Sequence, residues 1–101
     1  MKKAKFWQGM KIRALFHGIL SDWVGVPQAE IFLLEGGNFG DLLFEIRKAY
    51  GPNMPPQLWK KSQEEFNRAL WAMRGQEKLS EPTTKLKDGE EIKFFLTLAG
   101  G

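Results

Sequence analysis

The sequence has 101 residues, 43% of them hydrophobic, so a single domain with a buried core is expected. It has no cysteine, which excludes a disulfide framework and a thiolate zinc site, and the cytoplasm is the expected compartment. The formal net charge is +3, but the basic residues are interleaved with acidic ones, and no apolar run reaches transmembrane length. Neither a nucleic-acid partner nor a membrane partner is therefore expected.

The first nine residues differ in character from the rest of the chain. They are basic through Lys2, Lys3 and Lys5, and the aromatic pair Phe6–Trp7 is followed by Gln8 and Gly9. Because no apolar core follows the lysines, this stretch is not a secretory signal. We expect residues 1–9 to be an N-terminal extension, residues 10–98 to be one domain and residues 99–101 to be a flexible tail.

Two strands are predicted in the first third of the domain. Apolar residues alternate with polar ones over Lys11–Phe16, and a loop closed by Gly25 leads to a second strand over Ala29–Leu34. The inward positions are Ile12, Ala14 and Phe16 on the first strand and Ile31 and Leu33 on the second. Trp23 is expected in the loop between these strands.

A helix is predicted over Phe39–Tyr50. Its apolar stripe recurs every three or four residues and consists of Phe39, Leu42, Leu43, Ile46 and Tyr50. Asn38 can cap the helix with Asp41 in the capping-box position, and Gly51 and Pro52 end it. The glycines of segment 36–40 lack the spacing and the lysine of a phosphate-binding loop, so a turn with a helix cap explains them better.

The last third of the chain returns to strand patterns. Pro55 and Pro56 could start a short helix over the residues up to Glu65, but an irregular connection is expected over 53–65. A strand with Trp71 and Met73 facing the core follows it. Asp88 and Gly89 predict a tight turn, after which Ile92, Phe94, Leu96 and Leu98 alternate with less apolar residues. The strand Glu91–Leu98 therefore leads directly to the end of the sequence.

The sequence ends in Gly100–Gly101. Two glycines in succession lack Cβ atoms, so they can pass through a narrow channel in another protein and present an unhindered carboxylate. A glycine-rich frayed end is the simpler explanation of such a terminus taken alone. Its position directly after a strand favours the chemical explanation.

These features together indicate a family. The run Leu-Lys-Asp-Gly-Glu-Glu-Ile at 86–92, the aromatic strand after it and the terminal Gly-Gly resemble the MoaD/ThiS family of ubiquitin-like sulfur carriers, with the molybdopterin synthase branch as the nearest match. Segment 73–76 stands at the family's Val-Asn-Gly-Glu turn and departs from it at two residues. The resemblance starts near Met10 and implies an α+β, ubiquitin-like β-grasp fold, with a mixed sheet of four to five strands packed on one main helix.

The resemblance also implies a function. A ubiquitin-activating-type enzyme would adenylate the carboxylate of Gly101 with its own ATP and Mg²⁺, and a sulfur donor would convert it to a thiocarboxylate. The large molybdopterin synthase subunit, or an equivalent acceptor enzyme, would then take up the tail through Gly100. The alternatives are a carrier for thiazole or another sulfur pathway, a protein modifier, and a β-grasp binding module that is never activated.

A docking surface is expected on the outer face of the sheet. In a β-grasp the first and last strands are neighbours, so Leu15 and Phe95 should share that face, and Leu98 and Ala99 of the segment leading to the tail should contact the partner as well. The competing interpretation is that residues 1–9 cover this face through Phe6 and Trp7.

No enzyme active site, bound cofactor or metal site is expected within the chain. His17 is the only histidine and has no ligand partners at suitable spacing. Glu90 and Glu91 are adjacent on an extended segment, so their side chains should point to opposite faces and cannot act as a carboxylate pair.

Overall fold

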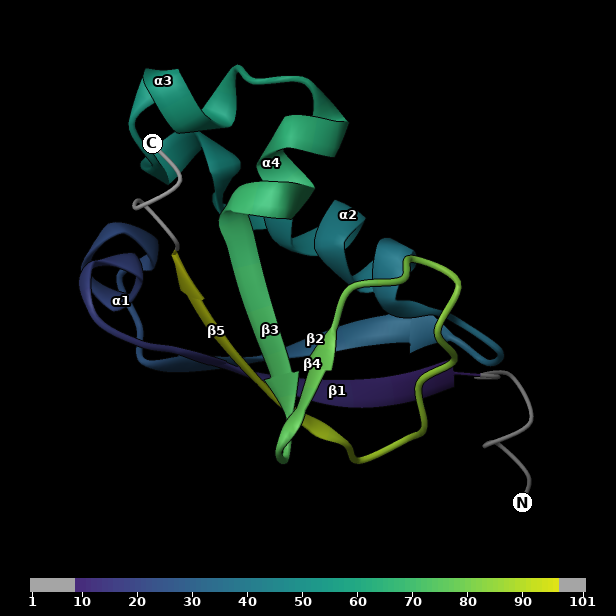
Figure 1. The fold of residues 1–101 in the computed structure, drawn as a ribbon. Coiled ribbons are helices and arrows are strands. Elements are labelled where there is room, and N and C mark those ends of the chain that lie inside the picture. Colours follow the sequence, from purple (N-terminus) through teal and green to yellow (C-terminus); the bar gives the residue numbers. More distant parts are fainter. Residues whose placement is uncertain (1–8, 97–101) are drawn as a thin grey trace.

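The computed structural model describes residues 9–96, which form a mixed sheet of five strands with helices against one of its faces (Figure 1). The strands are β1 (Gly9–Phe16), β2 (Gln28–Leu34), β3 (Leu70–Arg74), β4 (Glu77–Leu79) and β5 (Glu91–Leu96). The helices are α1 (Ile19–Val24), α2 (Phe39–Tyr50), α3 (Pro56–Trp59) and α4 (Gln63–Ala69), with a 3-10 turn, η2 (Gly51–Asn53), after α2.

The sheet has the strand order β2-β1-β5-β3-β4. β1 is antiparallel to β2 and parallel to β5, and β3 is antiparallel to both β5 and β4. The last strand therefore lies in the middle of the sheet beside the first one. This arrangement confirms the predicted β-grasp fold with five strands.

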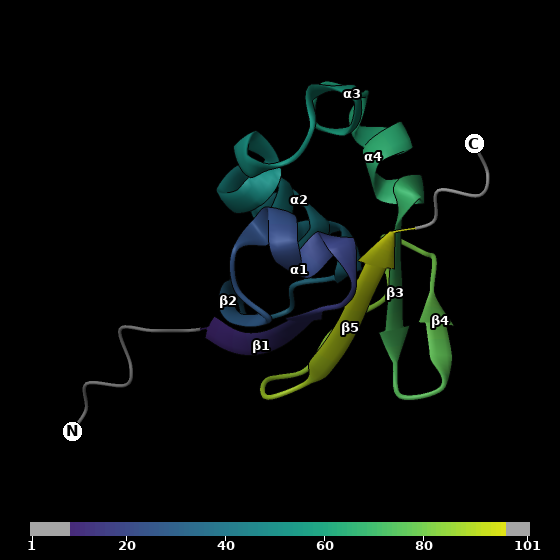
Figure 2. The same cartoon turned by 90° about the vertical axis from the view of Figure 1, so that its left-hand side faces the viewer.

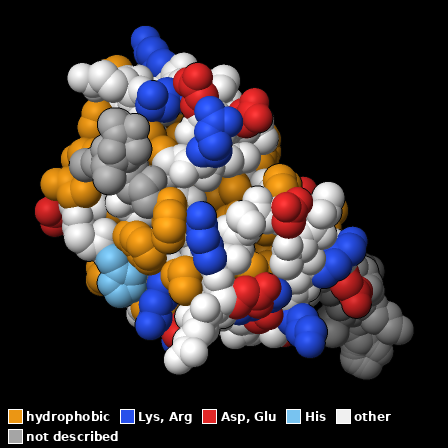
Figure 3. All heavy atoms as spheres, viewed as in Figure 1, with side chains coloured by type: hydrophobic (Ala, Val, Ile, Leu, Met, Phe, Trp, Pro, Cys, Tyr) orange, Lys and Arg blue, Asp and Glu red, His pale blue; other side chains and the backbone are white. Residues whose placement is uncertain are grey.

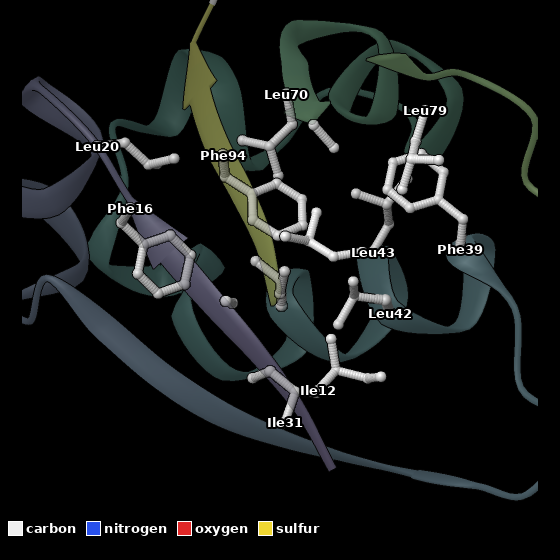
Figure 4. Packing of buried hydrophobic residues seen from close by; sticks show 14 of the residues in the cluster. Ile12, Phe16, Leu20, Ile31, Phe39, Leu42, Leu43, Leu70, Leu79 and Phe94 are labelled. Carbon is white, nitrogen blue, oxygen red and sulfur yellow. The ribbon is translucent and has the colours of Figure 1, made fainter. Parts of the chain in front are cut away.

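The core lies between the sheet and α2. Figure 2 shows α1 and α2 on one side of the sheet, and the opposite side carries none of the helices of the described segment. The inward residues of the strands meet the apolar stripe of α2 there, and Figure 4 shows Leu43 of α2 beside Phe94 of β5. Ile12 and Ile31 pair across β1 and β2 and are both buried, which confirms the predicted phase of these strands.

Helix α2 has the predicted bounds. The backbone N–H of Asp41 donates to the Asn38 side chain at 2.9 Å, and the N–H of Asn38 donates to the Asp41 carboxylate at 3.0 Å. This capping box satisfies two N–H groups that would otherwise lack partners at the helix start. Gly51 then leads into η2.

The structure corrects two loop predictions. Segment 53–65 is not irregular throughout, because α3 begins at Pro56 after the N-cap residue Pro55. The Ser62 hydroxyl caps α4 by accepting from the N–H of Glu65 at 3.1 Å. Trp23 does not lie in a loop but in α1, which is flanked by Gly18 and Gly25 at φ values of 64° and 96°. Positive φ is accessible to glycine at little steric cost, so these two residues bound the short helix.

The prediction for the face of β3 is wrong. Leu70 and Ala72 point into the core, at 3% and 0% exposure, whereas Trp71 and Met73 are only partly buried on the outer face. The residues on both faces of this strand are apolar, so the alternation of polar and apolar residues cannot show which face is buried. The pairing with β5 decides it, because Ala72 lies opposite the fully buried Phe94 in the register and therefore faces the core.

Gly51 allows α3 to pack closely on the end of α2. A Cβ at this position would clash with the ring of Trp59, which also lies 5.3 Å from the guanidinium of Arg47. We expect Gly51→Ala to lower the free energy of unfolding by about 1–3 kcal/mol, as overpacked substitutions do. Urea denaturation followed by circular dichroism measures this change.

The same substitution in a Trp59→Ala background is the control for the clash. Gly51 has helical dihedral angles, φ −51° and ψ −47°, where alanine is favoured over glycine by about 0.5–1 kcal/mol. Without the ring, Gly51→Ala should therefore be neutral or stabilising. A loss of stability that is equal in both backgrounds would contradict the packing explanation.

Candidate functional site

Four apolar side chains lie together on the outer face of the sheet, the face opposite α2. We call them the outer cluster: Leu15 of β1, Trp71 and Met73 of β3, and Phe95 of β5. Each of the four is partly buried. Their inward-facing neighbours Leu70, Ala72 and Phe94 belong to the core. The register places Trp71 opposite Phe95 and both Met73 and Leu15 opposite Lys93. Figure 3 shows hydrophobic side chains gathered on this side of the molecule.

The rings of the cluster contact one another and a lysine. The ring centroids of Trp71 and Phe95 are 6.0 Å apart at an interplanar angle of 40°. The Lys78 ammonium of β4 lies 3.7 Å from the Trp71 centroid, a cation–π distance. The cluster is therefore a packed aromatic surface and not a set of isolated exposed residues.

The charge around the outer cluster is positive. Lys78 and Lys93 border it and take part in no ion pair with residues of the segment 9–96. Further along the same face the charges are balanced, since Arg13 pairs with Glu91 at 3.0 Å and Lys11 with Glu30 at 3.7 Å. A partner that carries apolar groups with acidic groups beside them would complement this surface.

The structure brings together two of the predicted site residues. Leu15 and Phe95 lie on the same face of adjacent strands, as expected for neighbouring first and last strands. Leu98, Ala99, Gly100 and Gly101 lie outside the described residues. The described part of the chain ends at Leu96, next to Phe95 of the outer cluster, and five further residues follow in the sequence.

The outer cluster is out of reach of the aromatic pair near the N-terminus. Phe6 is three residues before Gly9, where β1 begins, and three residues of extended chain span at most about 11 Å. Leu15 is six residues along β1 from Gly9, about 20 Å away, and Phe95 lies further in the same direction because β1 and β5 are parallel. The first residues of the chain therefore cannot cover Phe95 through Phe6 or Trp7.

The other chemically interesting residues have structural roles. Glu90 accepts from the guanidinium of Arg74 at 3.3 Å and from the backbone N–H of Lys87 at 3.1 Å, whereas Glu91 pairs with Arg13 on the outer face. These contacts hold the turn before β5 against β1 and β3. Residues 9–96 contain no group of three or more His, Asp or Glu side chains arranged for a metal ion.

No helix within that same range is both long enough and apolar enough to cross a membrane.

Sequence reasoning missed three residues of this surface, Trp71, Met73 and Lys78. The pairing of β3 with β5 determines which residues of β3 face the core. Directly paired residues of two neighbouring strands point to the same face, and Ala72 is paired with the inward-facing Phe94. Trp71 then follows Phe95 to the outer face. The register of β3 against β5 could not be read from the sequence alone.

Comparisons with known proteins show the fold. No protein-family model matches the chain, and no curated protein sequence matches it at a significant level. Among solved structures, SAMP1 from Haloferax volcanii matches with a TM-score of 0.70 and 15% identity, over 90% of this chain and 99% of SAMP1. A putative molybdopterin converting factor subunit 1 from Pyrococcus furiosus matches with a TM-score of 0.65 and 21% identity, over 88% of this chain and 99% of that chain.

A third structure, the HVO 2177 protein of Haloferax volcanii, matches with a TM-score of 0.72 and 20% identity, over 93% of this chain and 89% of that one. The three proteins share the ubiquitin-like β-grasp fold with this chain. At these identities the likeness is one of architecture.

Proposed function

We propose that this chain is a carrier protein that is activated at its C-terminus, with Gly101 as the terminal residue that carries sulfur. One observation carries the proposal: β5, which contributes Phe95 to the outer cluster, ends at Leu96, and the sequence that follows it closes with Gly100–Gly101. Five residues of extended chain reach about 17 Å beyond Leu96. A partner bound to the outer cluster could therefore hold its active site within reach of the Gly101 carboxylate.

The proposed chemistry has two steps, both carried out by partner enzymes. In the first, a carboxylate oxygen of Gly101 attacks the α-phosphate of ATP on a ubiquitin-activating-type enzyme, which supplies the Mg²⁺, and pyrophosphate leaves. In the second, a sulfide-level sulfur donor attacks the carbonyl carbon of the acyl-adenylate and AMP leaves, which gives the thiocarboxylate. The chain is a substrate in both steps, and its fold supplies the docking surface and the reach of the tail.

The acceptor that we propose is the large subunit of a molybdopterin synthase, which would take the tail into its active site and transfer the sulfur to a pterin precursor. Two things support this branch: the resemblance of segment 86–92 and the terminal Gly-Gly to the MoaD/ThiS pattern, and the structural likeness to a protein described as a putative molybdopterin converting factor subunit. A carrier for thiazole synthesis would use the same tail with a different acceptor.

A protein modifier is the second candidate function. Another solved structure with the same fold is described as small archaeal modifier protein 1 of H. volcanii, at a TM-score of 0.70 and 13% identity. In that case a lysine amine of a target protein, in place of sulfur, would attack the carbonyl carbon of the adenylated Gly101, and AMP would leave as the isopeptide bond forms. The two functions share the activation step and differ only in the nucleophile.

Gly100→Val tests whether the diglycine is threaded into the activating enzyme. Valine is β-branched and strongly disfavours positive φ, so it should block passage through a narrow channel. We expect ATP–pyrophosphate exchange with the cognate activating enzyme to collapse while thermal unfolding stays unchanged. Thr83→Val, which introduces the same side chain at an exposed loop position, should exchange at the parent rate. Parent-rate exchange by Gly100→Val would contradict the threading step.

A further inference from the structure

A second apolar surface lies at the other end of the sheet. A groove of about 290 Å³ runs between β2, which is an edge strand, and helix α2. Its lining residues are Phe32, Leu33, Leu34, Asp41, Phe44 and Glu45. Leu34, Phe32 and Phe44 are 72%, 56% and 49% exposed, which makes them the most exposed large hydrophobic residues of the described chain. We call this the edge groove.

Exposed apolar residues along an edge strand are a liability, because such an edge can pair with other chains. Proteins commonly cover it with a further segment of their own chain. The outer cluster cannot serve this purpose, since it lies at the far end of β1 from Leu34.

The edge groove is acidic as well as apolar. Asp41 and Glu45 are part of its lining, and Glu35 follows Leu34 at the end of β2. The Asp41 carboxylate caps α2, whereas Glu35 and Glu45 make no hydrogen bond or ion pair with any residue from 9 to 96. A segment that combines aromatic rings with positive charges would complement this groove in both respects.

The chain enters the sheet beside this groove. Gly9, the first residue of β1, pairs with Leu34, and the eight residues before it include Lys2, Lys3, Lys5 and the pair Phe6–Trp7. Trp7 and Phe6 can reach about 7 and 11 Å from Gly9, and one strand spacing is about 5 Å, so both rings can cross β2 at Leu34. Lys2, Lys3 and Lys5 lie further back in the same segment, and the acidic Asp41 and Glu45 of α2 line the groove.

We propose that residues 1–8 of this chain occupy the edge groove. The rings of Phe6 and Trp7 lie against Leu34 and Phe44, and the lysines face Glu35 and Glu45. This placement shields the edge of β2 and leaves the outer cluster accessible to other proteins. It does not depend on the activation of Gly101.

Nuclear Overhauser effects on the complete chain test this placement without any substitution. We expect contacts from the ring protons of Phe6 and Trp7 to the Leu34 methyl groups and the Phe44 ring. A chain that starts at Gly9 keeps all five strands, and its amide shifts should change at Leu34, Phe44 and Glu45 but not at Trp71 or Phe95. Phe6→Ser combined with Trp7→Ser should reproduce these shift changes at full length.

Two outcomes would overturn the proposal. One is the absence of these contacts together with unchanged groove shifts in the shortened chain. The other is a dimeric complete chain whose groove contacts arise between a labelled and an unlabelled copy, which would make the occupant a second copy. Sedimentation equilibrium over a range of concentrations distinguishes the latter, because the proposal requires a monomer with a filled groove.

Discussion

Removal of Gly100 and Gly101 is expected to abolish sulfur transfer and to leave the thermal unfolding temperature unchanged. The two residues follow β5 in the sequence, and residues beyond the last element of a domain usually contribute little to its burial. The reactive carboxylate would move to Ala99, whose chain end is shorter by two residues and carries a methyl group where the partner's channel is narrow. A reconstituted assay with the cognate activating enzyme, a sulfur donor and the acceptor enzyme measures the loss.

A variant with a tail of equal length distinguishes the effect of tail length from the effect of the missing side chains. Gly100→Ala combined with Gly101→Ala keeps the length of the tail and a terminal carboxylate, and we expect it to lose most of the activity as well. If the shortened chain transfers sulfur at the parent rate, the tail is not the carrier. If only the alanine variant is fully active, the tail acts through its length and not through its glycines.

Phe94→Ala is expected to have the largest effect on stability, about 3–5 kcal/mol, as for other buried aromatic truncations. The side chain is fully buried in the central strand of the sheet, with its ring centroid 6.1 Å from that of Phe16. A small domain is stable by only about 5–15 kcal/mol, so this loss is a large share of the total. Chemical denaturation gives the change in the free energy of unfolding.

Phe95→Ala is the matched control, one residue further along the same strand. Its ring is partly exposed and contacts Trp71 in a cross-strand pair, an interaction worth about 0.2–1 kcal/mol. We expect little loss of stability and a weaker complex with the acceptor or activating enzyme. If Phe95→Ala unfolds the protein while Phe94→Ala weakens only the complex, the assignment of the two faces is inverted.

Helix α2 and the strands β1, β2 and β5 were predictable because each has one clear period in its sequence. The stripe of α2 is flanked by Asn38 and Gly51, and alternation in β1 separates Ile12 and Ala14 from charged neighbours. In such segments the local pattern and the tertiary environment agree, and the bounds follow within one or two residues.

Strand β3 and the segment before it could not be predicted in the same way. Leu70, Trp71, Ala72 and Met73 are all apolar, so burial depends on the pairing with β5 and not on the local sequence. Helices α3 and α4 are short, and tertiary contacts such as that of Arg47 with Trp59 and Phe66 help to hold them. Of the residues of the outer cluster, only Leu15 and Phe95 were therefore predicted from the sequence.

Intact-mass spectrometry tests the central claim most directly, because it reads the chemistry of Gly101 itself. The 101-residue protein is incubated with its cognate activating enzyme, ATP, Mg²⁺ and a sulfur donor. The account predicts a mass increase that corresponds to the exchange of one oxygen for sulfur, located by fragmentation at Gly101 and absent without ATP. Adducts on other proteins would identify a modifier instead, and an unchanged mass would contradict activation of the C-terminus.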